Sequence, residues 1–413
     1  METNTKEIRT CEVCGNTHLI SVLNLGLQPM CDDLVAIGDN RVCAQYPIEV
    51  LYCEKCCTAH QRFQIPKEKL FPRTYHYRAR FTVDVLDGMA DLVNSCEQRL
   101  GSLEGKTVLD IGCNDGSLLD FFREHNAKTV GIEPTDACHE ANKKDHVAFN
   151  KFLDTEVASE IVKSCGKPDL ISFTNVFAHI ENLNNVIDSL KILMHSDTVV
   201  VIENHYLGAV LDRNQFDTFY HEHPRSYSYT SFNYIAQSLG VKLLEVEFPS
   251  RYGGNIRVYL GSNENFAQKS SLNLDELQSK EKEFHSAFIK MQRNMQLWCN
   301  AKKAVLADIV RKHGKLKAKA FPGRSAILVK LLGLNEESIS AVYEKPGSMK
   351  IGNYVPGTRI PIYSDEDFFQ LSDKGQPVLN MAWHISSEIN GYLRDQGHTG
   401  PIIDILNAED FDD

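Results

Sequence analysis

The sequence predicts an α/β protein with a central, doubly wound parallel sheet, a small metal-binding unit before it and a second α/β unit after it. Two Cys-x-x-Cys pairs early in the chain predict the first unit. A strand, a glycine-rich turn and a helix at 107–120 predict the start of the central sheet, because strand and helix patterns alternate from there to residue 262. We place the three units at 1–70, 71–265 and 266–413.

The first unit contains the pairs Cys11/Cys14 and Cys53/Cys56. Four thiolates at this spacing can surround one zinc ion, and an ion closed by four thiolates has no open position for chemistry. We therefore expect a structural zinc site, with Cys57 as an alternative to Cys56. The N-terminus has no signal-peptide core, so we interpret the cysteines as metal ligands and buried thiols of a cytoplasmic protein.

Residues 71–106 begin with the polar and aromatic sequence FPRTYHYRARF, ahead of a helix expected at 83–100. One interpretation of this segment is a surface loop. The other is a substrate loop over a cleft, in which Arg78 and Arg80 bind an anionic group.

The stretch TVLDIGCNDGSLLD is typical of a ligand-binding turn. A short apolar strand runs into Gly112, Asn114 and Gly116, and such a turn puts free backbone N–H groups at the mouth of a parallel sheet. Asp110 lies at the end of this strand. Glu133 ends the next strand, where an acid accepts hydrogen bonds from a ribose. These acids favour a ligand with a ribose and a positive charge, such as S-adenosylmethionine (SAM).

Two polar segments follow later strands. Further strands are expected at 129–132, 169–173, 198–202, 241–248 and 255–260, the last two pairing antiparallel at the edge. His179 follows the strand at 169–173, which places it in the crevice where ligands bind. The run Tyr220-His221-Glu222-His223 pairs histidine with a carboxylate, as acid–base chemistry near neutral pH requires. A polar surface turn is the alternative.

The last unit begins with a helical pattern at 274–313, whose apolar stripe predicts a packing helix. We expect strands at 325–331, 338–342, 378–381 and 402–406, and helices at 365–371 and 384–395. The net charge of −11 and the pI near 5.8 argue against nucleic-acid binding. No apolar run reaches the ~18 residues of a membrane span.

Taken in order, these segments resemble the C-methyltransferases that act on nucleotide-linked 4-keto deoxysugars. The matching pieces are the two Cys-x-x-Cys pairs, VLDIGCNDGSLL, VGIEP, NVFAHI, FDTFYHEH, NYVPGTRIPI and LNMAWHISSEI. Each piece is weak alone, but together they cover almost the full length in the family's order. The resemblance implies a zinc-binding domain, a Rossmann-like SAM-dependent methyltransferase domain and a C-terminal Rossmann-like domain that binds a small-molecule substrate.

The resemblance also implies roles for single residues. The SAM-binding residues would be Asp110, Gly112, Asn114, Gly116 and Glu133, and we add Asn175 because it lies in the crevice after the strand at 169–173. His223, oriented by Glu222, would remove a proton from the carbon beside a ketone. Tyr220, His179 or Tyr77 would donate hydrogen bonds to the enolate oxygen. The enolate carbon would then attack the methyl group in line, with no metal at the reacting centre.

Two segments depart from the family pattern, at 75–80 and 321–335, and both would face the substrate. They leave the sugar, the nucleotide and even the acceptor class open, and the sequence does not indicate an oligomeric state. Three alternatives remain: an O- or N-methyltransferase on the same fold, an RNA-directed methyltransferase, and a binding or scaffold protein. The acid–base segment favours carbon, the negative charge disfavours RNA, and the intact cofactor residues disfavour a scaffold.

Overall fold

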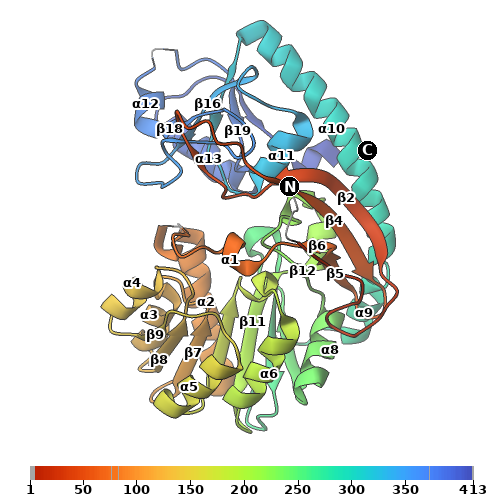
Figure 1. Cartoon of the computed structure of the whole chain (residues 1–413), viewed down its shortest axis with the longest axis vertical. Coiled ribbons are helices and arrows are strands. Elements are labelled where there is room, and N and C mark those ends of the chain that lie inside the picture. Colours follow the sequence, from red (N-terminus) through yellow and green to blue (C-terminus); the bar gives the residue numbers. More distant parts are fainter. Residues whose placement is uncertain (1–4, 76, 82, 372, 412–413) are drawn as a thin grey trace.

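The computed structural model describes residues 5–411 except 76, 82 and 372. Two α/β bodies lie one above the other, with the central sheet in the lower body and the C-terminal sheet in the upper one (Figure 1). Helix α10 (Phe284–His313) runs along one edge and joins them. Two long strands of the N-terminal unit lie beside this helix (Figure 1).

The central sheet has seven strands in the order β13-β14-β11-β10-β7-β8-β9. Their bounds are β7 (Thr107–Ile111), β8 (Lys128–Ile132), β9 (Val147–Phe149), β10 (Leu170–Thr174), β11 (Val199–His205), β13 (Lys242–Glu247) and β14 (Asn255–Gly261). The strands β7 to β11 are parallel and the last two are antiparallel at one edge. The predicted directions are confirmed, and only the short β9 was not predicted. The order reverses between β7 and β10, where ligands bind in such sheets.

Helices cover both faces of the central sheet. Helices α2 (Val83–Leu100) and α3 (Ser117–Glu124) pack on one face, and α5 (Thr155–Cys165), α6 (Leu183–Leu193) and α8 (Tyr229–Leu239) pack on the other. Side chains alternate between these layers along β11, where Val199 and Val201 join the first and Val200 and Ile202 the second. The helix predicted at 83–100 is confirmed. Shorter helices are α4 (Cys138–Lys143) and α7 (Leu207–Asp212).

The N-terminal unit is an antiparallel sheet with the order β12-β5-β4-β2. Its own strands are β2 (Ile20–Pro29), β4 (Gln45–Cys53) and β5 (Thr58–Gln61), and helix α1 (Lys67–Leu70) follows. Strand β12 (Arg225–Ser226) comes from the central unit. Two short pairs join β1 (Lys6–Glu7) to β6 (Phe63–Gln64) and β3 (Val35–Ala36) to β17 (Asn353–Tyr354) of the last unit. Because strand pairing crosses the expected boundaries at 70 and 265, these boundaries stay predictions.

The C-terminal sheet is parallel, with the order β18-β16-β15-β19-β20. Its strands are β15 (Leu316–Lys319), β16 (Ile339–Glu344), β18 (Ile362–Ser364), β19 (Val378–Asn380) and β20 (Ile402–Asp404), and its helices are α11 (Ser325–Leu332), α12 (Asp365–Phe369) and α13 (Ser386–Asp395). The strand predicted at 325–331 is wrong, because that segment is helix α11. Ser325–Val329 are all buried, so the period of this short apolar run does not distinguish a helix from a strand.

The pattern at 274–313 forms two helices, α9 (Leu274–Glu281) and α10, with a break at 282–283. Helix α10 is about 45 Å long at 1.5 Å per residue. Its apolar stripe, which includes Phe288, Met291 and Trp298, lies in a core shared with β2, α7 and α11. The predicted packing role is confirmed. In the described residues, no helix has the length and apolar character that crossing a membrane requires.

Candidate active site

The four predicted metal ligands come together. The sulfur atoms of Cys11, Cys14, Cys53 and Cys56 lie within 4.8 Å of one another, with Cys11–Cys56 at 3.4 Å and Cys14–Cys53 at 3.6 Å. Zinc–sulfur bonds of about 2.3 Å in a tetrahedron place the sulfurs about 3.8 Å apart, so this donor set fits zinc. Cys57 takes no part in the cluster, which settles the choice in favour of Cys56.

Polar groups surround these sulfur atoms. His60 Nε2 lies 3.3 Å from Cys11 Sγ, and Thr58 Oγ1 lies 3.0 Å from Cys56 Sγ. Such neighbours orient ligands and support their charge. Thr58 Oγ1 also lies 2.8 Å from Ser231 Oγ on α8. The metal cluster is therefore tied to the central unit, as a structural site would be.

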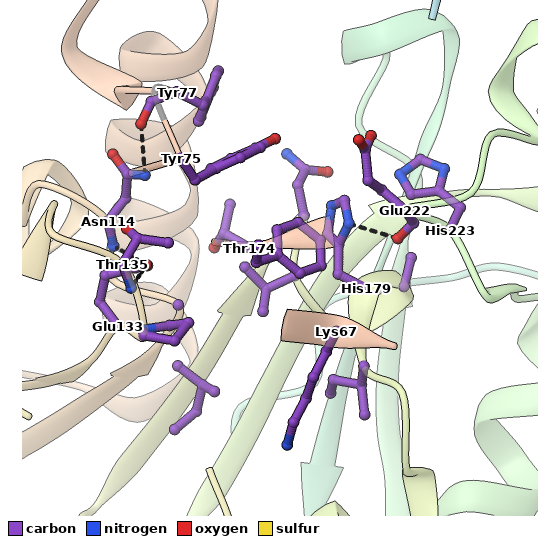
Figure 2. A pocket seen from close by; sticks show the side chains of 18 of the residues that line it. Lys67, Tyr75, Tyr77, Asn114, Glu133, Thr135, Thr174, His179, Glu222 and His223 are labelled. Atoms are coloured by element: carbon purple, nitrogen blue, oxygen red, sulfur yellow. Dashed lines mark hydrogen bonds between the residues drawn. The ribbon is translucent and has the colours of Figure 1, made fainter. Parts of the chain in front are cut away.

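A cavity of 570 Å³ opens at the carboxyl ends of β7, β8, β10 and β11. All three units line it: Asp32 and Lys67 belong to the first, and Arg324, Lys350 and His384 to the last. Nine predicted site residues from the central unit also line it, namely Tyr77, Gly112, Asn114, Glu133, Asn175, His179, Tyr220, Glu222 and His223. In Figure 2, Asn114 and Glu133 lie on one side of the cavity and His179, Glu222 and His223 on the other.

The turn after β7 forms one wall of this cavity. Gly112 has φ +76°, and a Cβ there would lie 2.6 Å from a methyl group of Val176, so only glycine fits. The next residues are fixed by Glu133, whose carboxylate accepts hydrogen bonds from the backbone N–H groups of Asn114 (3.1 Å) and Thr135 (2.9 Å). A carboxylate has about four acceptor sites, so Glu133 keeps others for a ligand.

Asp110 and Gly116 do not line the cavity. Asp110 is buried inside the sheet, where it accepts a hydrogen bond from Ser172 Oγ at 2.7 Å and burial raises its pKa to about 7. Gly116 has φ +78° just before α3, and a Cβ there would lie 2.9 Å from the His146 ring. We therefore assign both residues to shaping the turn rather than to contacting a ligand.

Several buried polar atoms of the cavity lack a partner in the described structure. At the ends of β10 and β11 they are Thr174 Oγ1, Asn175 Oδ1 and both amide atoms of Asn204, a residue that is 1% exposed. Buried polar atoms are nearly always hydrogen-bonded, so these positions fit ligand groups. Neither Thr174 nor Asn204 was predicted from the sequence, although Thr174 ends β10 and Asn204 is the second-last residue of β11, positions at the edge where the crevice was expected.

A cluster of rings forms the opposite side of the cavity. The ring centroid of His223 lies 4.2 Å from that of Tyr220, 4.9 Å from that of His179 and 5.7 Å from that of His205. His223 Nδ1 donates to the Thr218 carbonyl at 3.0 Å. Burial, with His179 and His205 nearby, lowers the pKa of His223 well below its usual range. Because a carbonyl only accepts, the neutral ring carries its proton on Nδ1 and has a free lone pair on Nε2.

The expected orientation of His223 by the Glu222 carboxylate is wrong. The carbonyl of Thr218 orients the ring instead, and the backbone carbonyl of Glu222 accepts a hydrogen bond from His179 Nδ1 at 2.7 Å (Figure 2). Burial and neighbouring Asp32 raise the pKa of Glu222 well above its usual range, although Lys350 opposes this shift. The Glu222 side chain therefore lies in a polar cluster with Asp32 of the first unit and Lys350 of the last unit.

The segment ahead of α2 lies against the turn after β7. Tyr75 and Tyr77 line the cavity, which supports the substrate-loop interpretation. Asn114 Nδ2 donates to the Tyr77 carbonyl at 3.1 Å, and the Ala79 N–H donates to Asn114 Oδ1 at 3.1 Å. His76 lies outside the described residues.

Arg78 and Arg80 do not line the cavity and are paired with acids, so the structure gives no support to their binding an anionic group there. Arg78 Nε donates to Glu140 at 2.7 Å, and Arg80 pairs with Glu140 and, at 3.2 Å, with Asp115. These pairs hold the segment against α4 and against the turn after β7.

Comparisons with known proteins agree with this geometry. Three family models match the chain in the order of its units: a putative zinc-binding domain at 11–71, a methyltransferase domain at 81–246 and a C-methyltransferase C-terminal domain at 250–401. One relative, C-methyltransferase NovU of Streptomyces niveus, is 27% identical over 401 residues, which cover 94% of this chain and 93% of NovU. The three matched domains and this relative identify the protein as a SAM-dependent C-methyltransferase.

Other similarities of this C-methyltransferase are confined to part of the chain. The ubiquinone biosynthesis O-methyltransferase of Acinetobacter baylyi is 23% identical over 126 residues, 30% of this chain and 50% of that protein. Magnesium protoporphyrin IX methyltransferase of Synechocystis, solved with bound SAM, is 14% identical, with a TM-score of 0.32 over 44% of this chain and 81% of that structure.

The cofactors of the C-methyltransferase are SAM and zinc. The cavity fits SAM, because Glu133 offers acceptors suited to ribose hydroxyls, and the unpartnered Oδ1 of Asn175 suits a positively charged group. The four thiolates fit zinc by distance and burial. The predicted α/β fold with its three-part organisation is confirmed.

Proposed function

We propose that this enzyme methylates the carbon beside the ketone of a nucleotide-linked 4-keto deoxysugar, in the biosynthesis of branched sugars. The observation that carries the proposal is the free lone pair on Nε2 of His223, held in a buried cavity. The similarity to a C-methyltransferase over nearly the whole chain supports carbon as the acceptor. The order of sequence motifs supports the sugar class.

Carbon–hydrogen bonds next to a ketone break only when a base accepts the proton. His223 accepts it on Nε2, because Nδ1 is committed to the Thr218 carbonyl. Burial raises the pKa of Tyr220 well above its usual range, so its hydroxyl keeps its proton and donates to the oxygen that gains charge. SAM, when bound, supplies the electrophilic methyl group that this carbon takes.

His179 has a different role from the one predicted. Burial lowers its pKa to about 4, so it is neutral, and its Nδ1 proton is committed to the Glu222 carbonyl. Its Nε2 can therefore only accept a hydrogen bond, and His179 does not donate to an enolate oxygen. It suits a hydroxyl of the substrate. Tyr77 stays a candidate donor.

The experiment is mass spectrometry of the holoenzyme in D2O with a panel of nucleotide-linked 4-keto-6-deoxysugars, with SAM or with S-adenosylhomocysteine. We expect deuterium uptake beside the ketone with either cofactor form, and a methyl group on carbon with SAM. His223→Asn should lower both rates by about 10²–10⁴-fold. His221→Gln is the matched control, because His221 points to the Tyr46 carbonyl and does not line the cavity.

A methyl group on oxygen or nitrogen, without deuterium uptake, would reject the carbon mechanism. Equal losses in the His223 and His221 variants would show that the effect comes from folding and not from proton transfer. Methylation of an acceptor outside the panel, with deuterium uptake, would keep the mechanism and reject the sugar class.

A further inference from the structure

Arg324 extends the last unit to the wall of the active-site cavity. It stands between β15 and α11, in one of the two segments that depart from the family pattern. The turn that carries it is packed closely against the N-terminal unit, since a Cβ on Gly323 would lie 3.2 Å from Cys31 Cβ. The turn that carries Arg324 is therefore held in place by the N-terminal unit.

The guanidinium group is held on three sides. Its Nε lies 3.2 Å from Asp217 Oδ2, its Nη1 donates to Thr218 Oγ1 at 3.3 Å, and its carbon lies 5.1 Å from the ring centroid of Trp383. The indole of Trp383 also donates to Asp217 Oδ2 at 2.9 Å. The Arg324 side chain is only 11% exposed. A guanidinium fixed in this way does not have to rearrange before it binds a ligand oxygen.

Two nitrogens of this group, Nε and Nη2, are buried without a hydrogen bond in the described part of the chain, and Nε has the Asp217 carboxylate nearby. Buried donors of a permanent charge are rarely left unbonded, so Nη2 marks the place of a ligand oxygen. Nη1 is bonded to Thr218, and Nε, although not hydrogen-bonded, lies 3.2 Å from the Asp217 carboxylate, which balances the charge of Arg324 and leaves Nη2 as the donor for a ligand.

The same residue, Thr218, holds both Arg324 and His223: its hydroxyl accepts from Arg324 Nη1 and its carbonyl accepts from His223 Nδ1. Two other histidines of the cavity are also close to this charge. Burial, with Arg324 as the next cause, lowers the pKa of His205 and of His384 to about 3. The guanidinium therefore lies at the site where the proposed base works.

We propose that Arg324 is a catalytic residue whose Nη2 donates a hydrogen bond to the ketone oxygen of the acceptor and stabilises the negative charge that forms there. The proposal rests on the proposed function. His223 Nε2 takes the proton, the C–H electron pair forms the enolate, and the charge moves to the oxygen beside Arg324. The enolate carbon then bonds to the methyl group as the S–CH₃ bond breaks, and the bound proton leaves to water.

The test compares Arg324→Gln with Arg359→Gln. Arg359 also ties the last unit to the first, through the carbonyls of Asp39 and Arg41, but does not line the cavity. The probe is the panel ketosugar that the wild-type holoenzyme turns over fastest, with S-adenosylhomocysteine in D2O. We measure deuterium exchange at saturating ketosugar, the Kd of the ketosugar, and SAM affinity as a check of folding.

We expect Arg324→Gln to lower the exchange rate by about 10²–10³-fold, as for loss of one donor to a developing oxyanion, with less than about a fivefold change in Kd. Added methylguanidinium should partly restore exchange in Arg324→Ala. Arg359→Gln should behave as wild type.

A weaker Kd with unchanged exchange at saturation would show that Arg324 binds a fixed anionic group, which overturns the proposal. Equal losses in both variants would also overturn it, because they would show a general effect of loosening the unit. If the wild-type enzyme transfers methyl groups without any deuterium exchange, the proposed function itself fails. Exchange in wild type that Arg324→Gln leaves intact would reject only the role of Arg324.

Discussion

The central and C-terminal sheets share a strand–turn–helix plan. Strand β7 leads into α3 and β15 leads into α11, each from the parallel middle of its sheet, where the strand order reverses beside it. In both units an acid accepts a backbone N–H of the turn, and this acid directly follows β8 or ends β16. Glu133 accepts the N–H of Asn114 at 3.1 Å, and Glu344 accepts the N–H of Phe321 at 2.6 Å.

The two crevices nevertheless differ in what fills them. In the central unit the turn is built from glycines, and the neighbouring strand ends leave polar atoms without partners. In the C-terminal unit, Phe321 is fully buried at the turn, and Lys319 pairs with Asp365 at 2.9 Å beside it, with both side chains at most 2% exposed. A parallel sheet thus supplies a location for a site, and the residues of the turn decide whether a ligand or the protein itself occupies it.

The largest expected effect tests the crevice of the C-terminal unit, which the protein's own side chains fill. Lys319→Met should lower the free energy of unfolding by about 3–5 kcal/mol, because it leaves the buried Asp365 charge unpaired. Urea unfolding checks this. Lys319→Met/Asp365→Leu should recover most of the loss. SAM affinity at low denaturant should not change, and a parallel loss of SAM affinity would break the comparison.

The second prediction replaces one glycine with alanine in each of the two turns. Gly112→Ala should weaken SAM binding at least about 100-fold, since it combines positive φ with a Cβ 2.6 Å from Val176. Gly323→Ala meets Cys31 at 3.2 Å without positive φ, and should change SAM binding less than about threefold. Calorimetric titration measures both. Equal effects would mean that both turns serve the cofactor.

The third prediction concerns the stability of the protein at acidic pH. Burial lowers the pKa of His221 in the central unit to about 4, against about 6.5 in the unfolded chain. The unfolded state therefore binds the extra proton, so this contribution to stability is complete above pH 6.5 and is lost as pH falls towards 4. His221→Gln keeps a donor for the Tyr46 carbonyl. It should reduce the stability difference between pH 7 and pH 5 by about 1–2 kcal/mol. An unchanged difference in urea unfolding would contradict this.

The smallest expected effect separates the two acids. Glu133→Gln should weaken SAM binding by about 5- to 10-fold, because it removes the charge but keeps one acceptor. Glu344→Gln should leave SAM affinity unchanged and act only on stability, since Glu344 does not line the cavity. Fluorescence or calorimetric titration of the two variants with SAM decides whether the two acids, which share one geometry, have different functions.

Local patterns predicted most of the central unit. The helix at 83–100 and the strands of the central sheet other than β9 follow from period and glycine placement, as the cysteine cluster of the first unit follows from spacing. The C-terminal unit was harder. Strand β15 reads as polar because it contains Lys317 and Lys319, and burial of Lys319 depends on Asp365, 46 residues away. No local period carries that information.

The active site shows the same limit. The glycines of the turn and an acid directly after a strand are each recognised from a few neighbouring residues, so the turn and Glu133 could be predicted. The orientation of His223 by a backbone carbonyl could not, because every residue has a carbonyl and only the fold selects Thr218. Arg324 lies 101 positions after His223 in the sequence but shares Thr218 with it.

The core around α10 restricts how this protein can be recombined. Leu23 of the first unit, Phe216 of the second and Ile327 of the third pack in the same apolar cluster as Trp298. A chimaera that imports a foreign last unit would have to match side chains from two others, and we expect most such chimaeras to be insoluble. New substrate ranges should then arise from changes in the short turn at 321–324, where one substitution alters the cavity and leaves the shared core intact.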